Sequence, residues 1–288
     1  MSFIPCLDHI IILVPRTYLT NLPSSITSAF TIYPGGTHAD NKTSNSLILL
    51  KSGVYLEFIA FIDDDPARKA GHWWGTKTPG SIIDFALTSD SVDEVEIVRK
   101  ALDTLKDGDK GRELVVGYQE SKRGGRKRPD GTSVEWTVTF PTPSIERGTI
   151  PFWCHDITPR ELRVPVQSAE EATKHPSCAV GASKIILVVS PERFGELCRV
   201  YEKILGGDRV KINGVAEFVV KQPLGDQPSS RIVLRQASSA EEKAVVAVNG
   251  GVAGIWEIIL AIRGSLPEPI IEKIGLGTIR IGFERIRE

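Results

Sequence analysis

The sequence has few cysteines and no apolar stretch long enough to span a bilayer. No apolar run approaches the roughly 20 residues that a transmembrane helix needs. The N-terminal stretch carries Asp8 and His9 and lacks both a basic leader and a small-residue cleavage site, so we expect a cytoplasmic protein. The cysteines include no CxxC pair and predict neither a disulfide framework nor a zinc knuckle. They are Cys6, Cys154, Cys178 and Cys198.

An excess of one charge is also lacking. Lys and Arg total 35 against 36 Asp and Glu, which leaves no overall field that would attract nucleic acid or an anionic membrane. The one dense basic run is KRGGRKR at residues 122–128. We interpret this run as a solvated hairpin tip, because nucleic-acid binding requires a wider basic surface. We therefore expect neither a nucleic-acid nor a membrane partner.

Motifs of several large enzyme classes are absent. The sequence has no GxSxG nucleophile elbow, no GxGxxG following a strand and no GxxxxGK phosphate loop. These absences argue against a serine hydrolase, a dinucleotide-dependent dehydrogenase and a nucleotide hydrolase.

What the sequence does contain is a repeated order of one strand, one helix and further strands. The first unit spans about residues 5–62. It predicts a strand at 7–14, a weak helix at 16–29, a turn-rich stretch at 33–40 and then a hairpin of two strands. Tight turns between the strands after the helix require antiparallel hairpins, which excludes a doubly wound parallel sheet.

A second unit follows with a better marked helix. A strand is predicted at 81–89, and apolar residues recur at helical spacing within 91–105. Ser91 and Glu94 are spaced as a capping box at the start of this helix. Three strands complete the unit, at 113–120, 133–140 and 150–157.

The C-terminal part repeats the pattern after a polar linker. We divide the chain into a first domain at residues 1–165, a linker at 166–180 and a second, more divergent domain at 181–288. The second domain opens with a strand and a helix that ends at Gly206. It closes with a shorter unit, for which we expect a short helix around 268–274 between two strands. The predicted fold class is α+β, with repeated βαβββ modules paired into half-open barrels of mainly antiparallel strands.

The order of these segments resembles a known family. LDHIIILV, VYLEFIAF, SIIDFALTS and RPDGTSVEW followed by IPFWCHDITPR resemble the glyoxalase-like domain family of the vicinal oxygen chelate (glyoxalase/bleomycin resistance/dioxygenase) superfamily. The resemblance covers about residues 5–165. It implies that two modules pack side by side around a cavity that binds a small molecule, and it is compatible with a homodimer formed through sheet edges.

The resemblance also implies where a metal would bind. Family ligands lie on the first and last strands of each module, which corresponds to His9 and Glu57 in the first module. In the second module it corresponds to Asp84 and to His155, with Cys154 as the less favoured candidate. Imidazole and carboxylate ligands suit zinc, nickel, manganese or iron, and they leave positions open for substrate oxygens. The alternative is that these side chains line a pocket without metal.

Other residues are predicted to line the ligand pocket. Paired indoles in the loop His72-Trp73-Trp74 suggest a lid over the pocket, and His38 lies either at its mouth or in a polar turn. Aromatic side chains commonly line small-molecule pockets, although core packing explains Trp136 and Trp153 equally well. The resemblance suggests that Arg126 or Arg128 reaches the pocket, where a guanidinium would bind the carboxylate of an acidic substrate.

Two functions remain open from the sequence. The first is an enzyme, either a lyase, an isomerase or a dioxygenase, that acts on a small oxygenated metabolite with Glu57 and His155 as catalytic groups. The second is a metal-free protein that binds or sequesters a small molecule, as bleomycin-resistance proteins do. Because fold does not determine function, the resemblance by itself does not choose between them.

Overall fold

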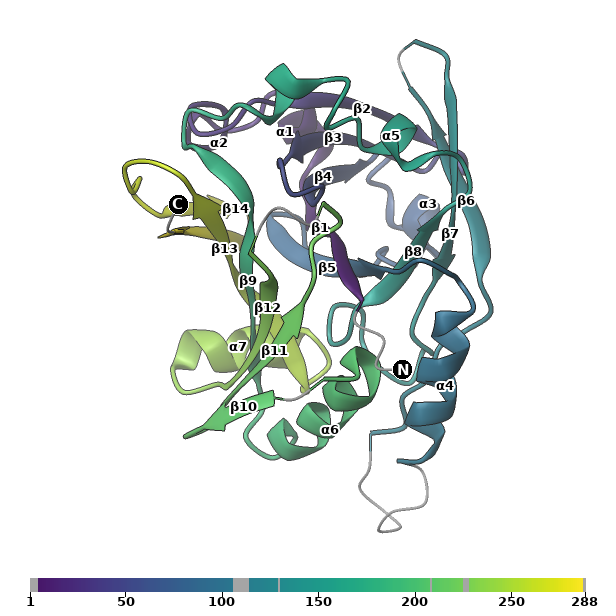
Figure 1. The fold of residues 1–288 in the computed structure, drawn as a ribbon, viewed down its shortest axis with the longest axis vertical. Coiled ribbons are helices and arrows are strands. Elements are labelled where there is room, and N and C mark those ends of the chain that lie inside the picture. Colours follow the sequence, from purple (N-terminus) through teal and green to yellow (C-terminus); the bar gives the residue numbers. More distant parts are fainter. Residues whose placement is uncertain (1–4, 106–113, 129, 208, 225–227, 287–288) are drawn as a thin grey trace.

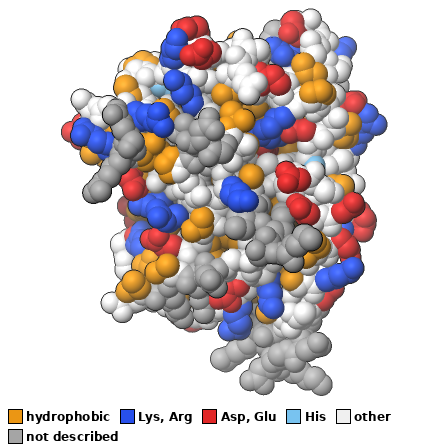
Figure 2. Space-filling view, viewed as in Figure 1, with side chains coloured by type: hydrophobic (Ala, Val, Ile, Leu, Met, Phe, Trp, Pro, Cys, Tyr) orange, Lys and Arg blue, Asp and Glu red, His pale blue; other side chains and the backbone are white. Residues whose placement is uncertain are grey.

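The computed structural model describes residues 5–105, 114–128, 130–207, 209–224 and 228–286. It contains two β-sheets that lie side by side, one formed by the N-terminal half of the chain and one by the C-terminal half (Figure 1). No helix among these residues is both long enough and apolar enough to cross a membrane. On the face shown in Figure 2, acidic and basic side chains are interspersed.

Eight strands close into a barrel in the order β1-β4-β3-β2-β6-β7-β8-β5. Each module forms half of it, and within each module the first strand pairs in parallel with the last. The halves join through two antiparallel pairings, β1 with β5 and β2 with β6. The strands are β1 (Cys6–Leu13), β2 (Tyr33–His38), β3 (Thr43–Leu49), β4 (Tyr55–Phe61), β5 (Ser81–Thr88), β6 (Lys122–Lys127), β7 (Ser133–Thr139) and β8 (Phe152–Asp156). The α+β modular fold is thus confirmed, with a closed rather than a half-open barrel.

The second sheet repeats this arrangement without closing. Its order is β10-β11-β12-β9-β13-β15-β14. The parallel pairs β12–β9 and β13–β15 and the antiparallel pair β9–β13 match those of the barrel. Among the described residues no strand takes the place of β6, so this sheet stays open. The strands are β9 (Ala179–Val189), β10 (Arg209–Ile212), β11 (Val215–Val220), β12 (Ser230–Gln236), β13 (Ala253–Ile262), β14 (Ile270–Ile274) and β15 (Gly277–Arg285).

The helices differ from expectation at several points. Pro23 divides the weak helix expected at 16–29 into two short ones, because proline fits the start of a helix and not its interior. The segment expected as a helix around 268–274 forms strand β14. The helices are α1 (Arg16–Thr20), α2 (Ser24–Thr27), α3 (Pro66–Lys69), α4 (Glu94–Asp103), α5 (Arg160–Arg163), the 3-10 helix η1 (Glu170–Thr173), α6 (Phe194–Leu205) and α7 (Ala240–Val248).

Helix caps also differ from the sequence interpretation. The hydroxyl of Ser91 accepts a hydrogen bond from the backbone of Asp93, and no capping box forms with Glu94. A complete capping box instead begins α7, between Ser239 and Glu242. Helix α6 ends at Gly206, as expected from the sequence.

The structure corrects the prediction that the basic run at residues 122–128 is a solvated hairpin tip. Residues 122–127 form β6, which pairs with β7 along its whole length and with the end of β2. A strand was also expected at 113–120. Residue 113 lies outside the described residues, and the described residues 114–120 form one isolated bridge, between Tyr118 and Pro141, instead of a strand. Gly124 and Gly125 allow β6 to approach β7 closely, because a Cβ at either position would clash with β7.

One hydrophobic core connects the two sheets. Buried residues of β1, β9 and α6, such as Ile10, Ile185 and Leu197, belong to the same apolar cluster. The hydroxyl of Tyr201 in α6 donates a hydrogen bond to the carbonyl of Thr149 beside the barrel. The barrel is therefore supported from outside, and its inner face remains available for a cavity.

Candidate functional site

A cavity lies inside the barrel. Its empty volume is about 750 Å³, including space that is open to solvent. Aromatic and other apolar side chains share the wall with many polar and charged side chains, and in ligand pockets such polar groups fix the orientation of the ligand. The polar and charged lining residues are His9, His38, Asp40, Thr43, Asn45, Glu57, His72, Arg123, Arg126 and Arg163, and the aromatic ones are Tyr55, Trp73, Trp74, Trp136, Phe140 and Phe152.

His9 is positioned on β1 by an irregularity in the strand. The register of β1 against β5 shifts between Leu7 and His9, so that Asp8 is an extra residue in the ladder. The side chains of Asp8 and His9 lie together as a result, and the Asp8 carboxylate accepts a hydrogen bond of 2.7 Å from His9 Nδ1. The His9 ring stacks on Tyr55, with ring centroids 4.7 Å apart.

Asp8 is the centre of a buried ionic cluster. Although burial raises the pKa of Asp8, Arg160 and Arg163 hold that pKa well below its usual range. Arg163 Nη1 donates to Asp8 at 2.8 Å, and the same guanidinium binds Asp156 and the hydroxyl of Tyr55. Asp8 is therefore ionised and fixed, and it keeps the proton of the His9 imidazole on Nδ1.

Glu57 faces the other side of the His9 ring. Its Oε2 lies 3.6 Å from His9 Nε2, and its Oε1 lies 3.5 Å from His38 Nε2. Asn45 donates a hydrogen bond of 2.6 Å to Oε1. His38 is held in turn by Thr43, whose hydroxyl is 2.7 Å from its Nδ1. Burial lowers the pKa of His38 and so favours its neutral form.

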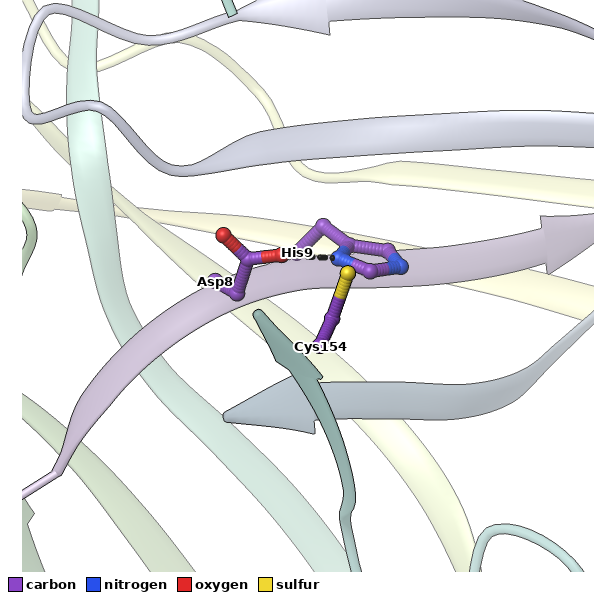
Figure 3. Close-up of side chains that lie close together, drawn as sticks. All are labelled: Asp8, His9 and Cys154. Carbon is purple, nitrogen blue, oxygen red and sulfur yellow. Dashed lines mark hydrogen bonds and ion pairs between the residues drawn. The ribbon is translucent and has the colours of Figure 1, made fainter. Parts of the chain in front are cut away.

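The structure brings Cys154, rather than His155, to this centre. Alternate residues of a strand face opposite sides, and in β8 Phe152 and Cys154 face the cavity. Figure 3 shows the Cys154 side chain close to the His9 ring, although β5 lies between β8 and β1 in the barrel. His155 stacks on Trp153 outside the cavity, and its Nε2 is 2.9 Å from the hydroxyl of Ser89. The expected convergence of His155 with His9 is thus corrected.

Asp84 also lies outside the cavity lining. Its carboxylate accepts a hydrogen bond of 2.8 Å from Trp74 Nε1 and forms an ion pair with Arg147. It is fully buried, and its oxygens are already used by these partners. Asp84 therefore anchors the loop that carries Trp74, whereas the sequence interpretation placed it on the ligand.

Three of the four tryptophans named from the sequence line the cavity. Trp73, Trp74 and Trp136 do so together with His72, whereas Trp153 is buried in the core between the sheets. Trp73 remains 38% exposed and contacts Phe140. Burial lowers the pKa of His72 to about 4, which keeps the residue neutral as part of an aromatic wall.

The two candidate arginines have different positions. Arg126 lines the cavity and is 4% exposed, whereas Arg128 does not line it. Arg128 donates to the hydroxyl of Tyr33 and lies 3.5 Å from Asp130. Of the two side chains suggested by the sequence, only Arg126 is in place to contact a ligand.

Several site residues were not identified from the sequence. Asn45 and Thr43 lie in the polar first part of β3, TSNS, and no signal in that segment distinguishes them from Ser44 and Ser46. Asp8 precedes His9, and only the strand irregularity turns both side chains to the same centre. Arg163 is in a short helix after the barrel, and no local pattern connects it to β1.

Two sets of side chains have donor atoms suited to a metal ion. Ligand atoms of Asp8, His9 and Cys154 lie within 4.8 Å of one another, but both arginines of the cluster already bind Asp8, and burial raises the pKa of Cys154 well above its usual range. The second set is His9, Glu57 and His38. Its nitrogen–oxygen separations of 3.5 and 3.6 Å compare with roughly 3.4 Å between tetrahedral ligands of zinc. Among the described residues, the group whose ligand atoms all lie mutually close is Asp8, His9 and Cys154, whereas Glu57 in the second set has no arginine partner that would compete with an ion.

Comparison with known proteins identifies the family. The resemblance to the glyoxalase-like domain family, which the sequence suggested, is confirmed. A family model described as "Glyoxalase-like domain" matches residues 7–199, and the chain belongs to this family. No curated protein matches the sequence.

Solved structures show the same fold. A hypothetical protein from Staphylococcus aureus aligns over 98% of this chain and 100% of its own, with a TM-score of 0.69 and 13% sequence identity. A mutant 4-hydroxymandelate synthase from Streptomyces coelicolor covers 91% of this chain and 72% of its own at a TM-score of 0.47 and 9% identity. A mutant glyoxalase I from Zea mays covers 97% and 94% at a TM-score of 0.30 and 10% identity. The last two TM-scores are too low to add to the assignment.

Proposed function

We propose that the protein is an enzyme that transfers protons on a small oxygenated metabolite bound in the barrel, with His9 and Glu57 as the catalytic groups. One observation carries the proposal. His9 Nε2 and Glu57 Oε2 face each other at 3.6 Å inside an aromatic-walled cavity, while Asp8 holds the opposite ring nitrogen. Because Asp8 holds the proton on Nδ1, Nε2 and the Glu57 carboxylate can each accept a proton, so the pair can carry a proton to and from a bound substrate.

Each neighbouring residue has a defined part in this arrangement. Asp8 fixes the tautomer of His9, so that Nε2 is the atom that gives or takes a proton. Asn45 holds Glu57 from the side away from His9. Tyr55 stacks on the His9 ring and Phe152 makes an edge-type contact with it, so the ring is restricted in orientation. The surrounding aromatic side chains exclude water, which strengthens electrostatic interactions within the site.

A divalent metal fits the same centre. His9, Glu57 and His38 would hold the ion, which would act as a Lewis acid on substrate oxygens. Metal analysis of the purified full-length protein tests this part of the proposal. We expect about one divalent ion per chain, lost in His38→Gln and retained in His155→Gln. Retention in His38→Gln and loss in His155→Gln would contradict the ligand set.

Catalysis is tested by solvent exchange. Small hydroxy- and oxo-compounds are incubated with the protein in deuterium oxide, and deuterium incorporation at carbon is followed by NMR. We expect His9→Gln and Glu57→Gln each to slow exchange by roughly 100-fold or more, the usual contribution of a positioned acid or base. Exchange that survives both substitutions would rule out the assigned pair.

A second candidate function is supported by the hydrogen bonds of Glu57. Asn45 donates a hydrogen bond to the Glu57 carboxylate, so this buried group has a partner without any added ion, as a metal-free binding protein requires. Tight ligand binding that is insensitive to chelators, in a protein that shows no exchange, would favour this function over the enzyme.

A further inference from the structure

Arg126 is a buried cation without a carboxylate partner. Three arginines of the described residues are buried: Arg126, Arg163 and Arg280. Arg163 pairs with Asp8 and Arg280 pairs with Glu241. For Arg126 the described residues provide no carboxylate within 4 Å, although a buried charge is stable only when it is paired or well hydrogen-bonded.

The hydrogen bonds of Arg126 use only part of its donor capacity. Nη1 donates to the side-chain oxygen of Asn45 at 3.2 Å, and Nη2 donates to the carbonyl of Arg163 at 3.0 Å. Both acceptors are neutral. Nε is buried and has no hydrogen-bond partner in the described residues. A guanidinium has five donors, so several remain for a ligand that reaches it from the cavity.

The walls next to Arg126 are aromatic. Arg126 pairs across the barrel seam with His38, whose ring makes an edge contact with Trp136 at 6.1 Å. Gly124 lies opposite Trp136 in the β6–β7 ladder, and a Cβ there would come within 2.8 Å of the indole nitrogen. The glycine therefore gives the indole the space it occupies beside the cavity. A flat apolar group fits between such walls.

We propose that Arg126 binds the carboxylate of an organic acid whose flat apolar portion lies against Trp136 and the neighbouring aromatic side chains. This inference rests on the proposed function and names the substrate class of the same cavity. The substrate carboxylate supplies the negative charge that no described side chain provides within 4 Å of Arg126. Binding is bidentate, as is usual between a guanidinium and a carboxylate.

A carboxylate fits this position better than a phosphate. Glu57 is linked to Arg126 through Asn45, which accepts from the guanidinium and donates to Glu57. Arg126 carries one positive charge, which a single carboxylate neutralises, and Glu57 close by repels any negative charge beyond that. A dianionic group would leave an excess of negative charge in a buried site.

Three small probes that carry the same phenyl ring test the inference. Benzoate, benzamide and phenylphosphonate share a phenyl ring and differ in charge. Their binding is followed through tryptophan fluorescence, because Trp73, Trp74 and Trp136 line the cavity. We expect benzoate to bind at least about tenfold more tightly than either of the others, since a charge-assisted pair contributes roughly 1.5–3 kcal/mol, and 1.4 kcal/mol corresponds to tenfold. Equal binding of benzoate and benzamide, or no saturable binding of benzoate, would overturn the proposal.

Variants separate this inference from the proposed function. Arg126→Gln should remove the preference for benzoate, and Arg126→Lys, which keeps the charge without the planar fork, should restore part of it. Arg128→Gln is the matched control, since Arg128 follows on the same chain segment and does not line the cavity. Glu57→Gln should retain benzoate binding while losing exchange activity. Undiminished benzoate binding in a folded Arg126→Gln would overturn the inference and leave the catalytic assignment intact.

Discussion

At the scale of single residues, the buried guanidinium groups of Arg163 and Arg126 have opposite surroundings. Arg163 is held by Asp8, Asp156 and Tyr55, so its burial is compensated on every side. Arg126 has only the neutral oxygens of Asn45 and of the Arg163 backbone. The first arrangement stabilises the fold and orients His9. The second leaves a charge available to a ligand at some cost in stability.

Replacing each arginine by methionine should separate these two roles. Arg163→Met leaves Asp8 and Asp156 buried with one fewer cation, and breaking a buried pair in this way costs about 3–5 kcal/mol of unfolding free energy. Arg126→Met removes an uncompensated charge and should change stability by less than about 1 kcal/mol in either direction. Urea unfolding without added organic acid measures both values. An equal loss in the two variants would show that Arg126 has a counter-ion of its own.

The candidate site was only partly predictable at this scale. The family pattern identified His9 and Glu57 because they lie on strands whose order is visible in the sequence. It named both His155 and Cys154 for the second module. The two are distinguished only by which side chains of β8 point into the cavity. Asp84 was chosen by the same pattern, but a loop tryptophan and a distant arginine occupy its carboxylate. Such contacts depend on tertiary structure that no local spacing records.

At the scale of elements, glycine-rich strands close the barrel. The sequence of β2, YPGGTH, suggests a turn, because proline and glycine are poor strand formers. In the structure Gly36 is required by close approach, since a Cβ there would lie 2.1 Å from the backbone oxygen of Lys127 in β6. Helix α6, by contrast, could be predicted from the sequence without knowledge of its tertiary contacts. Its apolar stripe faces the core, and Gly206 ends it in the left-handed conformation, with φ 64°.

Gly36→Ala should disrupt the seam between β2 and β6. The clash is with backbone, which does not move aside as a flexible side chain would, so we expect a loss of about 1–3 kcal/mol in unfolding free energy. Gly195→Ala in α6 is the control, because nothing lies within 4 Å of the added carbon and alanine favours helix by up to about 1 kcal/mol. Thermal unfolding of the two variants compares them directly. A Gly36→Ala protein as stable as the control would mean that the seam is not close-packed.

At the scale of the whole molecule, one arrangement of strands occurs twice. The second sheet follows the strand order of the barrel except that no described strand takes the place of β6. The predicted linker at residues 166–180 runs into strand β9, which begins at Ala179. Both sheets nevertheless share one apolar cluster. The repeat was visible in the sequence because the strand and helix order recurs. Closure of one sheet and not the other depends on β6, which composition alone presents as a basic loop.

Buried histidines should make the whole fold sensitive to acid. Burial lowers the pKa of four of the five histidines: His38, His72, His155 and His175. For His72 the pKa is about 4, against 6.5 when exposed. As pH falls below 6.5, the unfolded chain takes up protons that the folded protein does not, so stability is complete above pH 6.5 and is lost as pH falls toward 4. Asp8 adds a loss of the same sign at lower pH, where its carboxylate is protonated first in the unfolded chain.

Urea unfolding at pH 8, 7, 6 and 5 measures this dependence. We expect stability to be nearly level between pH 8 and 7, because the histidines are then neutral in both states, and to fall steadily from pH 6.5 downward. His72→Phe keeps an aromatic ring against Phe61, on which His72 packs edge-on at 5.0 Å, and removes one titrating group. Its loss of stability between pH 7 and 5 should be smaller than that of the unmodified protein. A variant with an unchanged pH profile would show that His72 is protonated equally in the folded and unfolded chain, and would place the acid sensitivity on the other buried histidines.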